Sequence, residues 1–124
     1  MKLHKENIIW LDEPEEHDYT AATQYMDLIT VTPTHYGTAL SSAPMTKYKA
    51  KDIFRASGLS LLGVSNSHIQ KNIKKLKKGK KLSPILLVRD NKLRKVIVAD
   101  GYHRLCTVYM IDEDAEIPCK IVHL

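Results

Sequence analysis

The chain has 124 residues, 44% of which are hydrophobic, and a formal net charge of +5 at pH 7. That length suits a single domain with an ordinary core. No run of about 18 apolar residues predicts a membrane-spanning helix, and the opening Met-Lys-Leu-His-Lys-Glu-Asn lacks the apolar stretch of a signal peptide. We therefore expect a cytoplasmic protein with no membrane partner, in which Cys106 and Cys119 are buried free thiols.

Residues 1–45 predict an extended arm followed by two helices. Residues 7–11 suit either a short strand or an extended arm. Apolar residues recur at three- and four-residue spacing over 19–29, which predicts an amphipathic helix with Asp18 as its N-cap. A second helix is expected over residues 33–42, because residue 33 is a proline, which is favoured at the first helical position.

The next part of the chain alternates short elements with loops. We expect a strand over 45–49 and a short helix over 51–56, which Gly58 ends. The apolar loop that follows, up to Val64, is expected to pack against the rest of the domain.

A lysine-rich helix is expected from Asn66 or Ser67, either of which can cap it, to about Gly79. Three apolar residues at i, i+4 and i+7 define its buried face: Ile69, Ile73 and Leu76. Lysines occupy its remaining surface: Lys71, Lys74, Lys75, Lys77 and Lys78. This pattern fits an ordinary solvated amphipathic helix, and it also fits a surface that contacts the phosphates of a nucleic acid.

The stretch after this helix predicts an anion-binding site. Two apolar strands, over 83–88 and 96–99, precede the turn Asp100-Gly101, and helical spacing resumes at Tyr102. A helix start presents unpaired N–H groups and a partial positive charge, and phosphate is the commonest biological anion to bind there.

Four residues at this turn are given roles in phosphate binding. Gly101 allows the backbone to approach the ligand closely. His103 and Arg104 offset the charge of the phosphate. Asp100 either caps the helix or helps to hold a magnesium ion.

Asp100-Gly101-Tyr102-His103-Arg104, preceded by its apolar strand, resembles the D-G-x-H-R signature of the ParB/sulfiredoxin-like superfamily. The flanking order is similar as well: a helix, then an x-P-I-x-V strand at residues 83–88, and a closing strand at 117–122. The resemblance covers residues 46–124. It implies an α+β domain, with a small mixed β-sheet flanked by helices, on which residues 1–45 form an N-terminal helical extension.

The resemblance also implies a ligand. Members of this superfamily hold nucleotide phosphates at this helix start, and their activities include CTP hydrolysis, ATP-driven repair of cysteine sulfinic acid and phosphorylation of free serine; some relatives are described as nucleases. His103 and Arg104 match the phosphate-contacting pair, and Tyr102 lies beside them. His68 and Lys71, near the start of the lysine-rich helix, are implied on the second side of the same pocket.

The chain departs from the better-known members in two places. Tyr102 stands where sulfiredoxin has its cysteine and where the partition proteins have a glutamate. A downstream helix-turn-helix region, typical of the partition proteins, is missing. Neither of those two activities is therefore expected.

We expect a nucleotide-phosphate-binding protein, either a nucleotide hydrolase or a small-molecule kinase, that uses Mg²⁺ with a nucleoside triphosphate or diphosphate. Asp100, His103 and Asp52 are the candidate catalytic residues, with Asp52 as a candidate base and Asp100 as the metal ligand. The alternative is a non-enzymatic nucleic-acid-binding module that uses the basic helix within 71–81. A third possibility is a protein that binds a partner and retains a relic pocket.

Overall fold

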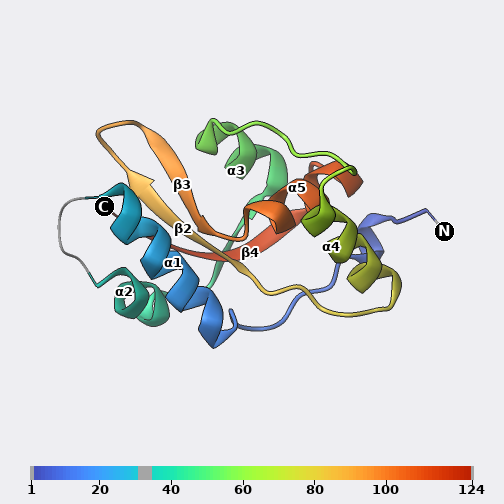
Figure 1. Cartoon of the computed structure of the whole chain (residues 1–124), viewed down its shortest axis with the longest axis horizontal. Coiled ribbons are helices and arrows are strands. Elements are labelled where there is room, and N and C mark those ends of the chain that lie inside the picture. The colour runs from blue at the N-terminus through green and yellow to red at the C-terminus, as the bar shows by residue number, and fades with distance from the viewer. Residues whose placement is uncertain (1, 31–34, 124) are drawn as a thin grey trace.

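The computed structural model describes residues 2–30 and 35–123 and shows one four-stranded mixed β-sheet with helices on both faces (Figure 1). The helices are Glu16–Ile29 (α1), Tyr36–Ser42 (α2), Ala50–Ser57 (α3), Ser67–Lys77 (α4) and Tyr102–Ile111 (α5), with a short 3₁₀ turn at Lys5–Asn7. The strands are Thr46–Lys49 (β1), Ile85–Asp90 (β2), Lys95–Asp100 (β3) and Glu116–His123 (β4). The expected α+β class is confirmed.

The sheet has the order β1-β4-β2-β3. β2 and β3 form an antiparallel hairpin, whereas β2 and β4 are parallel and β1 pairs antiparallel with β4. The connection from β3 to β4 contains α5. Because β3 ends at Asp100 and α5 begins at Tyr102, one residue, Gly101, joins the sheet to this helix.

Two hydrophobic clusters fill the two faces of the sheet. α1 and α2 cover one face, while α3 and α5 cover the other and α4 packs against α5 (Figure 1). Successive residues of β2 point to opposite faces, so Ile85 and Leu87 join one cluster while Leu86 and Val88 join the other. This double burial explains why the strand is apolar throughout.

The lysine-rich helix α4 has the predicted ends. The side chain of Asn66 accepts hydrogen bonds from the backbone N–H groups of His68 (2.9 Å) and Ile69 (3.3 Å), so Asn66 is the N-cap. At the other end Gly79 follows the C-cap with a φ of 74°, the left-handed conformation that favours glycine.

The N-terminal part differs from expectation in one important way. α1 begins at Glu16 rather than at Tyr19, and Asp18 is not its N-cap but a buried residue of its first turn. The expected start of the second helix at residue 33 lies outside the described residues, and α2 is described from Tyr36. The arm before α1 pairs through Trp10 with Leu82 in a single parallel bridge.

In the part of the chain that the structure describes, none of the helices combines the length and the apolar character needed to cross a membrane.

Candidate anion-binding site at the N-terminus of α5

Gly101 makes the sharp turn from β3 into α5. Its φ of 107° lies in the left-handed region, and a Cβ at this position would clash with the side chain of Ile85 and lie 2.8 Å from Nη2 of Arg104. The glycine is thus required by the backbone and by its neighbours, whether or not a ligand approaches.

No side chain caps the N-terminus of α5 among the described residues. The expectation that Asp100 caps this helix is therefore wrong. Its carboxylate accepts a hydrogen bond of 2.9 Å from Nη2 of Arg104 instead of one from a helix amide. The first N–H groups of α5 are left without a side-chain partner and remain available to an anion.

Arg104 bridges two carboxylates from different elements. Besides the bond to Asp100, its Nη1 lies 3.8 Å from Oδ1 of Asp18 in the first turn of α1. The side chains of Asp18 and Arg104 are only 4% and 17% exposed, so this pairing is shielded from solvent. It joins the starts of α1 and α5 across the end of β3.

Asp18 is held from a second side by Ser83. The Ser83 hydroxyl donates a short hydrogen bond to Oδ2 of Asp18 and accepts one of 3.1 Å from the backbone N–H of Glu15. Sequence reasoning missed both Asp18 and Ser83 as members of this cluster. Asp18 belongs to an acidic run in the sequence, and nothing in its spacing marks it as the buried member.

The cluster raises the pKa of Asp100 to about 6. Burial is the main cause, and the negative charge of Asp18 adds to it, while Arg104 opposes both. The net charge of the cluster therefore changes near pH 6 as Asp100 gains or loses its proton.

The starts of α4 and α5 lie side by side. The imidazole rings of His68 and His103 have centroids 4.4 Å apart. One turn further along each helix, Thr107 donates to the carbonyl of His103 (2.8 Å) and accepts from Nδ2 of Asn72 (3.4 Å), which fixes the two helices side by side. Burial, then the neighbouring His68 and Arg104, lower the pKa of His103. It is therefore largely neutral at pH 7.

Lys71 and Asp52 have different relations to this cluster. Lys71 is exposed and follows His68 by three residues on α4, which places the two on the same side of the helix. Asp52 borders an apolar groove with Val96, at the opposite end of β3 from Asp100. Four residues of strand correspond to roughly 13 Å, so the structure does not bring Asp52 to the site.

The residues present do not fit a magnesium ion held by the protein. Among the described residues no three His, Cys, Asp or Glu side chains are grouped as metal ligands. The carboxylate of Asp100, the expected ligand, is already bonded to Arg104 and has a raised pKa, and both properties weaken it as a ligand for a hard cation.

Two polar atoms near the start of α5 are buried without a hydrogen-bond partner among the described residues, the Tyr102 hydroxyl and Nε of Arg104. Burial, together with the Cys106 thiol beside it, raises the pKa of Tyr102 to about 12, so this residue stays neutral. Cys106 and Cys119 are both buried and free, as expected. The other two guanidinium nitrogens of Arg104 face carboxylates, whereas its Nε has no partner among the described residues.

Comparison with known proteins adds no further constraint. No family model matches the chain, and neither a curated protein nor a solved structure matches it. The resemblance to the ParB/sulfiredoxin-like superfamily therefore rests only on the sequence, namely the signature at residues 100–104 and the order of its flanking elements.

Proposed function

We propose that this protein binds a nucleotide through its phosphates at the N-terminus of α5. One observation carries the proposal: the starts of α4 and α5 meet at His68 and His103, whose ring centroids are 4.4 Å apart. The side chain of Asn66 caps α4, whereas no side chain caps α5 among the described residues. The free N–H groups of Tyr102, His103 and Arg104 would bind phosphate oxygens, and Lys71 would approach them from α4.

The charges of the cluster set the conditions for this binding. With both carboxylates ionised, Arg104 is more than neutralised by Asp18 and Asp100, which disfavours an anion. Protonation of Asp100 near pH 6 removes one negative charge. Phosphate binding should therefore strengthen as the pH falls from neutral towards 6.

A reaction at this site would be attack of a hydroxyl oxygen, from water or from a small alcohol, on the terminal phosphorus of a nucleotide. Asp100 is the carboxyl suited to accept the proton of that hydroxyl, since its pKa of about 6 lies near neutral pH. The shortened nucleotide would leave with the electrons of the broken P–O bond. Hydrolase and kinase differ only in which hydroxyl attacks.

The test is isothermal titration calorimetry at pH 6 with ATP, ADP, CTP and GTP, each with and without magnesium. We expect saturable binding of at least one nucleotide. The imidazole N–H of His103 would donate a further hydrogen bond to the charged phosphate, so His103→Gln should lower the affinity about tenfold, the equivalent of one charge-assisted hydrogen bond. His4→Gln is the matched control, because His4 is exposed in the N-terminal arm. Binding of none of the four nucleotides, or equal affinities in the two variants, would contradict the proposal.

Nucleic-acid binding by α4 is the second candidate, and one observation favours it. Five lysines of this helix and its C-cap are exposed and make no ion pair with another described residue: Lys71, Lys74, Lys75, Lys77 and Lys78. Such a row can neutralise successive phosphates of a nucleic-acid backbone, with affinity that falls steeply with salt.

Fluorescence anisotropy with a labelled duplex DNA and a labelled RNA, over a series of salt concentrations, tests this candidate. Reversing Lys74, Lys75 and Lys78 to Glu should abolish binding. The control reverses three exposed lysines outside α4, namely Lys5, Lys47 and Lys92. It makes the same change in net charge and should lower the affinity only modestly. Equal losses in both variants would show that only the net charge matters and would exclude a site on α4.

A further inference from the structure

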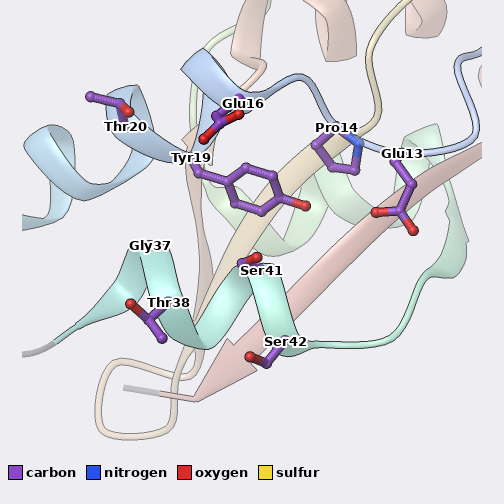
Figure 2. A pocket seen from close by; sticks show the side chains of 9 residues that line it. All are labelled: Glu13, Pro14, Glu16, Tyr19, Thr20, Gly37, Thr38, Ser41 and Ser42. Atoms are coloured by element: carbon purple, nitrogen blue, oxygen red, sulfur yellow. The ribbon is translucent and has the colours of Figure 1, made fainter.

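A second site lies on the other face of the sheet. A cavity of about 630 Å³ opens between α1, α2 and the chain segment before α1 (Figure 2). Its walls carry carboxylates and hydroxyls from seven side chains: Glu13, Glu16, Tyr19, Thr20, Thr38, Ser41 and Ser42. On α1, Glu16 lies opposite Asp18 around the helix. The cavity lining includes none of Asp18, Ser83, Asp100 and Arg104, so the cavity is separate from the site at α5.

The buried ammonium group of Lys120 contacts three walls of this cavity. Lys120 of β4 is only 3% exposed, and its Nζ donates to the carbonyl oxygen of Ser41 at 2.9 Å. The same nitrogen lies 3.5 Å from Oε2 of Glu13 and 5.4 Å from the ring centre of Tyr19. One cation is therefore tied to three walls, each from a different segment of the chain.

Lys120 keeps its charge despite its burial. Burial alone favours the neutral amine, but the contacts with Tyr19 and Glu13 outweigh it and raise the pKa of Lys120 above its usual value. Truncating this residue would release all three walls. The relative positions of these walls therefore depend on contacts of Lys120 that are shielded from solvent.

The lining disfavours strongly charged ligands. An anion would face the carboxylates of Glu13 and Glu16, while the ammonium of Lys120 already pairs with Glu13 and leaves a cation only one uncompensated carboxylate. A neutral ligand needs no net charge in the cavity. The carboxylates can accept hydrogen bonds from its hydroxyls, and the hydroxyls on α2 can both donate and accept.

The ring of Tyr19 supplies the apolar part of the site. It reaches from α1 across the cavity, and its hydroxyl lies between Pro14 and Ser41 (Figure 2). An aromatic face next to several hydroxyls and carboxylates suits a molecule with C–H groups on one side and hydroxyls at its edge. We propose that the cavity between α1 and α2 binds a neutral polyhydroxylated ligand, namely a monosaccharide or a cyclic polyol.

The test is a titration of ¹⁵N-labelled protein, followed by amide chemical shifts, with glucose, ribose and myo-inositol as separate probes. Spermidine and citrate serve as the cationic and anionic counterparts. We expect saturable shifts at residues 13, 15–20 and 37–42 with at least one of the three neutral probes at millimolar concentration. Absence of such shifts with all three, or saturation by spermidine or citrate alone, would overturn the proposal.

Two exposed lining residues allow matched variants that should fold normally. Glu16→Gln and Ser42→Ala should each lower the affinity for the neutral probe about fivefold, the effect of one hydrogen bond. Glu116→Gln and Ser60→Ala make the same changes at exposed positions outside the cavity and should leave it unaltered. If Glu16→Gln and Ser42→Ala bind as tightly as these controls, the ligand does not occupy this cavity.

Discussion

Nη1 of Arg104 lies 3.8 Å from Oδ1 of Asp18, which joins the first turn of α5 to the first turn of α1. The same guanidinium bonds Asp100 at the end of β3. One side chain therefore connects the N-terminal extension to the strand–turn–helix unit of the core. It also sets the charge that any anion at the start of α5 would meet.

Arg104→Ala should destabilise the protein by about 3 kcal/mol at pH 7, because it removes the cation from the buried carboxylate of Asp18 and the half-buried carboxylate of Asp100. Arg55→Ala, at an exposed position on α3, should cost less than about 0.5 kcal/mol. Urea unfolding followed by circular dichroism measures both. Similar stabilities of the two variants would show that the buried pairing contributes nothing.

The raised pKa of Asp100 makes stability depend on pH. Between its usual value of 3.8 and about 6, the folded state binds this proton more readily than the unfolded state does. The contribution is therefore fully present below about pH 4 and is lost as the pH rises through 6. Between pH 4 and pH 7 the free energy of unfolding of the wild type should fall by about 1 to 2 kcal/mol relative to that of Asp100→Asn.

The comparison with Asp100→Asn is needed because His103 acts in the opposite direction. Its pKa is lowered in the folded state, so its contribution is lost as the pH falls below the usual value of 6.5. Both proteins retain His103, so the difference between their free energies of unfolding reports on Asp100 alone. If this difference stays constant from pH 4 to pH 7, the pKa of Asp100 is not raised.

Gly101→Ala should destabilise the protein by about 2 kcal/mol or more. The substitution forces a side chain into a φ of 107° and into contact with Ile85 and Arg104. Gly63→Ala is the matched control, since a Cβ there meets nothing within 4 Å and needs no left-handed backbone. Thermal unfolding should separate the two variants by several degrees. Equal unfolding temperatures would refute this account of the turn.

Asn66→Ala removes the cap of α4 and should cost about 1 kcal/mol. Asn91→Ala, at an exposed position after β2, provides the comparison. Amide hydrogen exchange should speed up in the first turn of α4, where His68 lies. Unchanged exchange in that turn would indicate that the helix start is fixed by its packing on α5 instead.

The elements of the core could be predicted because local signals coincide there. The run from Val96 to Leu105 combines an apolar strand, a turn and helical spacing, and the structure places β3, Gly101 and α5 in that order. Asn66 and Gly79 marked the ends of α4 through their own side chain and backbone preferences. Each of these signals lies within a few residues of the feature that it predicts.

The site was less predictable because its contacts join distant parts of the chain. The sequence predicts Asp18 as a helix cap, since aspartate is favoured there. In the structure α1 begins two residues earlier, at Glu16, and Asp18 is buried against Ser83 and Arg104. Lys120 carried no signal at all, because a lysine within a strand resembles a solvent-facing residue. Which polar residue is buried depends on the tertiary packing, and spacing along the chain does not encode it.

The central claim is that an anion binds the free N–H groups at the start of α5, and amide chemical shifts on titration with ADP at pH 6 test it most directly. The account predicts that the largest saturable shifts occur at Tyr102, His103 and Arg104, with smaller ones around His68. If those three amides do not move while residues 71–81 do, the phosphates are bound by the lysines of α4. If no amide moves, the start of α5 is not a nucleotide site.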